Sequence, residues 1–513
     1  MKLKMFSGYI RNLKSLCHEL NLSWEGERQE LEKKVILKAW DKWGTDTGNH
    51  LYGAFSFAIL NENTDELFCI RDQLGIEQMY YYVTDKGEML YCSDIRTIRS
   101  NPEFRASIDM EALQTYIMFG YSAGEKTLYK GLRKLLPGNY LVFSKGTVQL
   151  HPYCKLLFSP QYDITEDEWC DRIEATAKTI IAEDIETCGA KSSAAFLSSG
   201  VDSSWLLFLF GAENAISVGY ENAYGDETGS AFETAKVLGR SFRKKTVTPK
   251  DYFDALPILC KGLELPLADA SSPVFFLGCK EASRISDFGF SGEGPDEFFA
   301  GYKLHRRADT LALDGEALHF GSFGLLSEEE AGELLGFRNS KFNGAALVSD
   351  IYRDTAEGEH LSRLLAIDIK LFFEGDILFN LSRNAKANGI TVTAPFADPR
   401  MLELSATIPS GLKLKDGQDK YIFRRTAARK LPNNIAFREK KGFSVPVSIW
   451  MREEAIQDRM ASVLFGELSE LFFDRKLLRK WWDELLSGDI GKWNALYGIY
   501  IFLIWYGSCY LHG

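Results

Sequence analysis

The stretch that most constrains this fold runs from Ala194 to Ser204, where an apolar segment ends in small and hydroxylated residues. An apolar pattern resumes from Trp205 to Phe210, so the sequence predicts a buried strand, a tight loop and the first turns of a helix. Backbone N–H groups of such a loop, together with the helix N-terminus, attract phosphate. A plain serine-rich turn before a helix is the alternative interpretation.

Asp202 is out of place in a loop built only for anions, because its carboxylate would repel a phosphate. The residue makes sense if Mg²⁺ lies between the carboxylate and the phosphate. No Gly-Lys-Ser/Thr ending follows, so this is not a Walker-type loop. The stretch therefore predicts a binding site for a nucleotide pyrophosphate with magnesium.

A second short apolar stretch, Phe288 to Phe290, ends in an acidic loop with several glycines. Glu293, Asp296 and Glu297 fall within five positions, and like charges this close are costly without a cation or a basic partner. A solvated acidic turn is the alternative, but the surrounding glycine and aromatic residues favour a binding site.

The segments between these two stretches predict an α/β fold. Ala215 to Tyr220 is expected to form a second parallel strand, and Ala231 to Leu238 a helix. With the two motif strands they make a β-α-β-α-β series, typical of a doubly wound parallel sheet. Both motif loops would then lie at the carboxyl ends of their strands, where such sheets bind ligands. Further along, Leu361 to Ile377 is expected to be helical.

These stretches resemble the synthetase domain of the asparagine synthetase family of the class B type, which carries SGGxDS and SGEGxDE motifs. Pro395 to Asp398 is similar to the family's PF-x-D element. The segments Asp419 to Arg425 and Arg438 to Val447 are similar to its C-terminal signature. The resemblance implies that residues 165–513 form an ATP-pyrophosphatase-type ligase domain with a helical C-terminal part.

The resemblance also implies a reaction and its cofactors, ATP and Mg²⁺. A substrate carboxylate attacks the α-phosphate of ATP, giving an acyl adenylate and pyrophosphate, and an amine or ammonia then displaces AMP. Stabilising the developing charge is most of the task. Lys440, in the family's R-x-K-x-x-F pattern, is the expected catalytic cation, with a solvated face as the alternative. Glu293 is expected to accept a proton from the attacking amine, with a structural salt bridge as the alternative.

Other roles carry over by position. Asp202 and Asp296 are the expected Mg²⁺ ligands, and Arg383 and Asp269 the expected substrate contacts. Asp419 and Arg424 are expected to form a structural ion pair. The remaining positions expected to contact the nucleotide are Leu197, Ser198, Ser199, Gly200, Ser203, Ser204, Val218, Gly219, Ser291 and Gly292.

Residues 1–155 resemble the family's glutaminase domain, which implies an N-terminal nucleophile hydrolase-like, β-rich sandwich. Leu51 to Leu60 matches its GxFAFAI pattern, and Arg71 to Ile76 matches its RDxLGI pattern. The turn residues Asn61 to Asp65 between the apolar runs Leu51 to Leu60 and Leu67 to Asp72 predict a hairpin. A linker from His151 to Pro160 is expected to separate this domain from the next. A capping-box pattern at Thr165 to Glu168 then opens a helix.

The N-terminal domain departs from the family at its catalytic residues. Glutaminases of this type use an N-terminal cysteine thiol activated by its own α-amine, but position 2 is Lys2 and the first cysteine is Cys17, on a predicted helix. The family's NGEIYN element reads Ser7 to Asn12, with Ser7 and Tyr9 in place of Asn and Glu. We therefore predict a truncated, catalytically silent domain that serves as a scaffold or docking surface. A wrongly assigned start codon is the alternative.

The synthetase domain departs from the family as well. Ser199 replaces the first glycine of the usual loop pair. Where related enzymes read K-x-D-R-x-S-M-A followed by L-E-x-R-x-PF, only Arg383 survives among the charged residues. The positions that carry Lys, Asp, Met, Glu and Arg in the family are here Asn380, Ser382, Lys386, Thr391 and Thr393. Since such positions lie near the acyl substrate in the family, the environment of the acyl substrate is expected to differ, and the resemblance implies aspartate as the acyl donor less securely than ATP as the activator.

The sequence predicts an AMP-forming amide ligase that acts on a small-molecule or peptide carboxylate without glutaminase activity of its own. The amine would be ammonia, supplied free or by a separate glutaminase, or an amine within the substrate itself. The second case occurs in the related lasso-peptide cyclases, which act on a precursor peptide, and in β-lactam synthetases. A non-catalytic binding protein with the same fold is a further alternative. A tRNA- or sulfur-modifying enzyme is disfavoured because the chain has no CxxC pair.

Composition narrows the remaining classes. The net charge of −11 argues against nucleic-acid binding. The nine cysteines are scattered singly, which argues against a disulfide framework or a zinc site and favours a reducing cytoplasm. The start of the chain lacks the apolar region of a signal peptide. The longest apolar run, Ala495 to Tyr506, is shorter than the roughly 20 residues of a membrane helix, so it is expected to be a buried helix and no membrane contact is expected.

Overall fold

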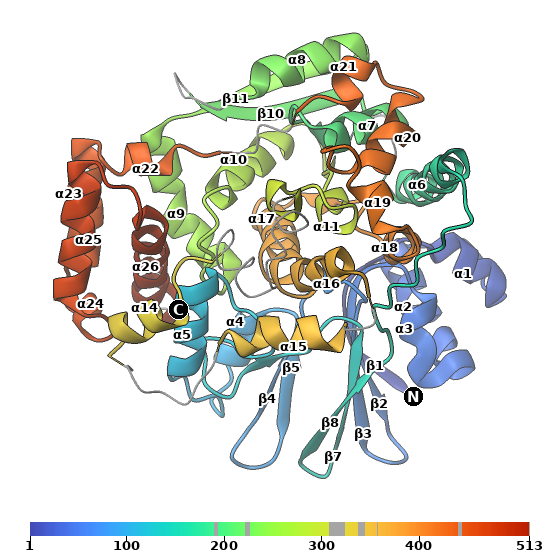
Figure 1. Cartoon of the computed structure of the whole chain (residues 1–513). Coiled ribbons are helices and arrows are strands. Elements are labelled where there is room, and N and C mark those ends of the chain that lie inside the picture. The colour runs from blue at the N-terminus through green and yellow to red at the C-terminus, as the bar shows by residue number, and fades with distance from the viewer. Residues whose placement is uncertain are drawn as a thin grey trace.

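The N-terminal part of the chain forms two antiparallel sheets, at the bottom of Figure 1. The computed structural model describes residues 1–188, 193–220, 226–306, 324–336, 344–355, 358–439 and 444–511. The larger sheet has the order β1 (Lys2–Ile10), β2 (Gly53–Asn61), β3 (Glu66–Arg71), β7 (Asn139–Ser144), β8 (Thr147–Pro152). The smaller has the order β5 (Met89–Cys92), β4 (Tyr80–Val83), β6 (Arg133–Lys134). Strands β2 and β3 pair antiparallel, which confirms the predicted hairpin.

Helices cover the larger N-terminal sheet. They are α1 (Leu13–Glu19), α2 (Arg28–Trp43), η1 (Gly44–Asp46) and α3 (Thr47–His50). Two further helices, α4 (Ile95–Arg99) and α5 (Met110–Phe119), follow later in the chain. Helix α2 buries Val35, Ile36 and Trp40 in one cluster with Phe55 and Phe57 of β2. The spacing of these α2 residues is that of one apolar helix face, which explains why the segment is helical.

A parallel five-stranded sheet follows, which confirms the α/β class. Its order is β11 (Ser241–Val247), β10 (Asn214–Tyr220), β9 (Ala194–Phe196), β12 (Phe288–Phe290), β13 (Thr391–Thr393), and all neighbours run parallel. Strands β11 and β13 extend the sheet beyond the predicted series. Neither has an apolar pattern that reveals it, because β11 reads SFRKKTV and β13 has only three residues.

The strand order places the two motif loops together. The chain runs from the central strand β9 outward to β10 and β11, and then crosses to the other side of β9 to form β12 and β13. The loops after β9 and β12 therefore leave adjacent strand ends at the point where the strand order reverses, which is where open parallel sheets bind ligands.

Helices surround this sheet (Figure 1). The predicted helix start at Thr165 is confirmed, since its hydroxyl accepts the Glu168 N–H over 3.3 Å at the beginning of α6 (Glu166–Cys188). The next helices are α7 (Val201–Phe210), α8 (Thr228–Val237), α9 (Pro249–Leu263), α10 (Ser272–Ala282), α11 (Pro295–Phe298), α14 (Glu328–Leu334) and α15 (Ala346–Asp354).

The helix predicted over Leu361 to Ile377 is longer and less regular in the structure. It consists of α16 (His360–Ile367), the π-helical segment η2 (Asp368–Leu378) and α17 (Phe379–Ala387) in direct succession. A Cβ at Gly375 would lie 2.5 Å from the Tyr121 ring, so this part of η2 can pack against the N-terminal domain only without a side chain. That close packing is a tertiary contact, which an apolar pattern does not reveal.

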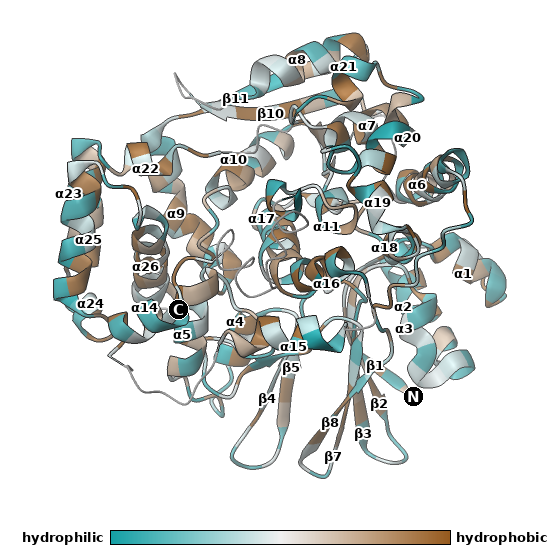
Figure 2. Cartoon of the chain, in the orientation of Figure 1, coloured by the Kyte–Doolittle hydropathy of each residue, from teal (hydrophilic) through white to brown (hydrophobic). Residues whose placement is uncertain are grey.

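The C-terminal part is helical. Its elements are α18 (Pro399–Ala406), α19 (Ser410–Lys413), α20 (Tyr421–Ala428), α21 (Asn433–Ala436), α22 (Val447–Trp450), α23 (Glu454–Leu464), α24 (Glu467–Glu470), α25 (Arg475–Ser487), α26 (Trp493–Trp505) and η3 (Tyr506–Tyr510). Helix α26 is buried along nearly its whole length, as predicted. Figure 2 shows both teal and brown on α25, which buries only one face against the core. Across the described residues, no helix combines the length and the apolar character needed to cross a membrane.

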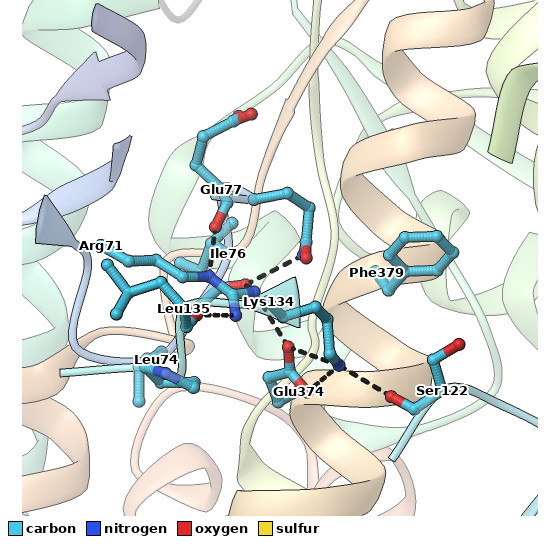
Figure 3. A network of polar contacts seen from close by, with 12 residues as sticks. Arg71, Leu74, Ile76, Glu77, Ser122, Lys134, Leu135, Glu374 and Phe379 are labelled. Carbon is cyan, nitrogen blue, oxygen red and sulfur yellow. Dashed lines mark hydrogen bonds and ion pairs between the residues drawn. The ribbon is translucent and has the colours of Figure 1, made fainter. Parts of the chain in front are cut away.

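A buried ion network joins the two domains (Figure 3). Glu374 of η2 accepts Arg71 Nη2 over 2.9 Å and Lys134 Nζ over 3.0 Å, and all three side chains are at most 3% exposed. Arg71 also donates to the carbonyl oxygens of Gly75, Glu77 and Leu135. The charges of Lys134 and Arg71 outweigh the effect of burial and hold the pKa of Glu374 below its ordinary value. The N-terminal domain thus contributes two buried cations to one carboxylate of the synthetase domain.

Replacing this carboxylate is expected to destabilise the protein strongly. In Glu374→Gln, Arg71 and Lys134 keep their buried charges without a counter-ion, which costs on the order of 3–5 kcal/mol. The denaturant midpoint should fall accordingly. Glu125→Gln is the matched control, because Glu125 forms an exposed ion pair with Arg133 and such pairs contribute at most about 1 kcal/mol. Equal effects of the two changes would contradict this account of the interface.

Candidate functional site

The loops after β9 and β12 touch each other. A Cβ at Gly292 would lie 2.9 Å from the Ser203 nitrogen and 3.1 Å from the Asp202 carbonyl carbon, so only glycine allows this approach. The residues from Ser198 to Ser204 and from Ser291 to Glu297 therefore line one site. Its location is the one that the sequence predicts.

Lys420 joins the two loops. Its Nζ lies 2.6 Å from Asp202 Oδ2 and 2.9 Å from Asp296 Oδ1, and its side chain is 1% exposed. Burial lowers the pKa of Lys420, but the two carboxylates outweigh that effect and raise the pKa well above its ordinary value. The structure thus brings the two predicted Mg²⁺ ligands together on one fixed positive charge.

The sequence predicted no role for Lys420. Its only signal was its place in the Asp419-Lys420-Tyr421 motif, where the neighbouring Asp419 was expected to pair with Arg424. That pair is confirmed at 2.7 Å. Lys420 itself precedes α20 in the left-handed region, with φ 49°, a conformation that costs a non-glycine residue roughly 1–3 kcal/mol. Two ion pairs offset this cost.

The acidic loop separates its three carboxylates into different environments. Asp296 pairs with Lys420, whereas Glu293 accepts the Ser291 hydroxyl over 2.9 Å. Glu297 is buried and accepts the hydroxyl of Tyr302. Burial, with the charge of Asp296, raises the pKa of Glu297 to about 8, which favours its neutral form. The Lys420 charge beside Asp296 and the raised pKa of Glu297 both reduce the repulsion expected from the sequence.

The predicted phosphate loop is internally hydrogen-bonded. Ser198 N–H donates to Ser203 Oγ over 3.1 Å, and Gly200 N–H to Ser198 Oγ over 3.1 Å. Ser199 donates from its hydroxyl over 2.8 Å and its N–H over 3.2 Å to Glu227 Oε2. Ser204 Oγ donates to the Gly200 carbonyl over 2.7 Å. The serine that replaces the family's glycine is thus held by a carboxylate at the start of α8.

Arg438 anchors the segment that leads to Lys440. Arg438 Nη1 donates to the Ser199 carbonyl over 3.2 Å and to Thr234 Oγ1 over 3.2 Å. Arg424 Nη1 in turn donates to the Arg438 carbonyl over 3.0 Å. Lys440, the predicted catalytic cation, lies outside the described residues.

Three further expected nucleotide contacts lie directly after β9 or on β10. Leu197 follows β9 directly and is buried, and its N–H donates to the Ile216 carbonyl over 2.8 Å. Val218 and Gly219 are at the carboxyl end of β10, beside the same loop. A Cβ at Gly219 would lie 2.5 Å from Asp226 Oδ1, so a side chain here would displace Asp226.

Asp269, an expected substrate contact, belongs with Glu293 to the carboxylates whose charges act on Asp376. It accepts the Ser271 N–H over 2.8 Å and Asn380 Nδ2 over 3.2 Å. Burial raises the pKa of Asp376 on η2 well above its ordinary value, and the charges of Asp269 and Glu293 raise it further. The sequence did not indicate Asp376, since a single aspartate in an apolar helix has no distinguishing pattern. Asn380, where the family has lysine, gives Asp269 a neutral partner.

Arg383, the other expected substrate contact, pairs with a different set of residues. It is 2% exposed, donates to the Ser93 carbonyl over 2.8 Å and lies 3.5 Å from Glu264 Oε1. Its guanidinium thus bridges the two domains instead of lying with Lys420, Asp202 and Asp296. The substrate role of Arg383 stays a prediction.

Comparison with known proteins agrees with this architecture. Residues 189–507 match the model of the family described as asparagine synthase, and residues 3–154 match that of the glutamine amidotransferase domain. A glutamine-hydrolysing asparagine synthetase of Bacillus subtilis is 25% identical over 98% of this chain and 85% of its own length. A putative glutamine-hydrolysing asparagine synthetase of Mycobacterium tuberculosis is 27% identical over 98% of this chain and 84% of its own length. An amidase of Penicillium rubens is 22% identical over 81% of this chain and 73% of its own length.

An antiparallel amidotransferase-type domain joined to a parallel-sheet nucleotide-binding domain defines the class of two-domain amide-forming ligases. The chain belongs to the asparagine synthase family. It is an asparagine-synthetase-like ligase that forms carbon–nitrogen bonds in an ATP-dependent reaction.

Removing the Lys420 charge is expected to make the protein depend on a divalent cation. Lys420→Met leaves Asp202 and Asp296 facing each other in a largely buried site, which should cost about 3 kcal/mol. Added Mg²⁺ should then raise the unfolding midpoint more in the variant than in the wild type, since a ligand that binds only the folded state stabilises it. Thermal unfolding in Mg²⁺ and in chelator measures both effects. Lys415→Met, which removes a partly exposed pair with Glu166, is the control. A variant as stable as this control would refute the role of Lys420.

Proposed function

We propose that this chain activates a substrate carboxylate with ATP, releasing pyrophosphate, and transfers the acyl group from the adenylate to ammonia or an amine. The observation that carries the proposal is the meeting of Asp202 and Asp296 on Lys420 at the reversal point of the sheet. The two carboxylates carry one more negative charge than Lys420 neutralises, so beside a loop that opens a helix they suit a polyphosphate that binds together with Mg²⁺.

Asp202 and Asp296 fit Mg²⁺, because their oxygens converge on one cation and carboxylate oxygens are the ligands that this ion prefers. Within the described residues, no group of three or more His, Cys, Asp or Glu could hold a metal by protein ligands alone. Mg²⁺ in nucleotide sites is commonly bound by one or two carboxylates together with phosphate oxygens. When bound, Mg²⁺ would supply charge neutralisation on the leaving pyrophosphate.

The protein groups divide the remaining work. The N-terminus of α7 and the hydroxyls from Ser198 to Ser204 would hold the phosphates. Lys440 follows Arg438, whose side chain anchors this loop, by two positions in the sequence. Its ammonium group would stabilise the negative charge that develops on the α-phosphate. Glu293, which already accepts a hydrogen bond from Ser291, would take a proton from the attacking amine.

The N-terminal domain, in this proposal, hydrolyses no glutamine. Its first cysteine, Cys17, is 1% exposed on α1, and burial raises the pKa of its thiol. Two residues of the altered strand element are engaged elsewhere, since Ser7 Oγ donates to Glu77 and Tyr9 OH accepts Arg11 Nη2. Ammonia would therefore come from solution or from a separate glutaminase.

The acyl donor, we further propose, is not aspartate. Asn380 replaces a family lysine and donates to Asp269, so this wall of the site presents carboxylates without the expected cation. Because this wall differs from the one expected for aspartate, intramolecular amide formation of the kind that peptide cyclases catalyse is the second candidate.

Pyrophosphate release from ATP tests the proposal. Release should require Mg²⁺ and a carboxylate substrate, and product formation should respond to ammonia or an amine but not to glutamine. In Glu293→Gln, ATP–pyrophosphate exchange should persist while amide formation falls by roughly 10²–10⁴-fold, because only the second step needs the base. Lys440→Ala should lose both reactions. Stimulation by glutamine in the purified protein would refute the silent N-terminal domain, and unchanged turnover in Lys440→Ala would refute its catalytic role.

A further inference from the structure

A buried arginine of the N-terminal domain reaches into the synthetase domain. Arg11, directly after β1, has a side chain that is 0% exposed. Its Nε donates to Asp184 Oδ1 of α6 over 2.8 Å, and its Nη1 forms an ion pair with Asp398 Oδ2 at the start of α18. Both carboxylates are fully buried as well.

Two departures from the family meet at this group of residues. Arg11 stands at the tyrosine position of the element that reads NGEIYN in the family, next to Tyr9, which binds Arg11 Nη2. Thr393 on β13 stands where the family carries an arginine before its PF element, and its hydroxyl donates to Asp184 Oδ2 over 3.3 Å. Compared with the family pattern, this chain has gained an arginine at position 11, next to Asp184 Oδ1. It has lost the arginine at position 393, next to Asp184 Oδ2.

The two carboxylates need this positive charge. Burial, together with the charges of Asp398 and Glu183, raises the pKa of Asp184 above its ordinary value, and Arg11 opposes this rise. Burial also acts on Asp398, but Arg11 and Arg400 outweigh it, so the pKa of Asp398 lies below its ordinary value. Arg400 is already shared between Asp398 and Glu183. Arg11, in contrast, pairs with both Asp184 and Asp398. A buried carboxylate without a cation is strongly destabilising.

We propose that Arg11 supplies, from the N-terminal domain, the charge that the family carries at position 393, and that Arg11 is a positioning residue for the ligase site. The positioning role rests on the proposed ligase function. In this arrangement the former glutaminase strand is a structural part of the synthetase.

The anchored segment packs directly on the acidic loop. A Cβ at Gly294 would lie 2.9 Å from the Phe396 carbonyl oxygen and 3.0 Å from the Ala397 nitrogen, and Asp398 follows immediately. Ser291 N–H also donates to the Thr393 carbonyl over 2.9 Å. Arg11 thereby fixes the backbone against which the loop with Glu293 and Asp296 rests.

A double-mutant cycle tests this relocation of the positive charge from position 393 to position 11. Arg11→Thr should lower the unfolding midpoint and lower the turnover of pyrophosphate release by roughly 10- to 100-fold, with a smaller change in KM for ATP, because the acidic loop loses its support. Adding Thr393→Arg to Arg11→Thr should recover most of both losses. Thr393→Arg alone should destabilise, because it places a second cation beside Arg11.

The matched control is Lys14→Thr, which breaks an exposed ion pair between the same two parts of the chain, Lys14 of α1 and Glu186 of α6. It should change neither stability nor turnover measurably. If Arg11→Thr does not fold, recovery of folded protein on adding Thr393→Arg supports the relocation, and continued failure overturns it.

The outcomes separate the two proposals. A double variant no more stable than Arg11→Thr overturns the relocation, whatever the enzyme does. A double variant that regains stability without turnover overturns the positioning role alone. A wild-type protein that releases no pyrophosphate with any carboxylate refutes the ligase proposal, while the unfolding cycle still decides the relocation.

Discussion

The site depends on a single ammonium group between two carboxylates. Asp202 and Asp296 belong to loops from adjacent strands, and without Lys420 their charges would push the two loops apart. The ion pairs also hold Lys420 in its left-handed backbone conformation at the start of α20. One side chain thus couples the central strand, its neighbour in the sheet and the C-terminal helices.

Cations play the same part at the domain boundary. Glu374 receives Arg71 and Lys134, and Asp184 and Asp398 receive Arg11, so in each case the N-terminal domain supplies the positive charge and the synthetase domain the carboxylate. Removing one partner of a buried pair is far costlier than removing an exposed pair. This asymmetry gives the N-terminal domain a structural role that does not depend on glutamine hydrolysis.

The sequence sufficed for the central strands, the loop positions and the convergence of Asp202 and Asp296 on one site. Short apolar stretches followed by glycine-rich loops are local signals, and the α/β class fixes where parallel strands end. Strand β11, with its run of charged residues, and Asp376, within an apolar helix, gave no such signal. The partners of Arg11, Arg383 and Lys420 lie far away along the chain, and only the packed structure shows which carboxylate each cation reaches.

The serine at position 199 has a consequence for how the loop receives a ligand. The N–H groups of Ser198, Ser199 and Gly200 are already paired with side-chain oxygens of Ser203, Glu227 and Ser198. A phosphate must therefore take over these donors by exchange, and the gain is the difference between two sets of hydrogen bonds. Displacing the Glu227 carboxylate would carry the largest cost, because Glu227 is the one charged acceptor among the three partners.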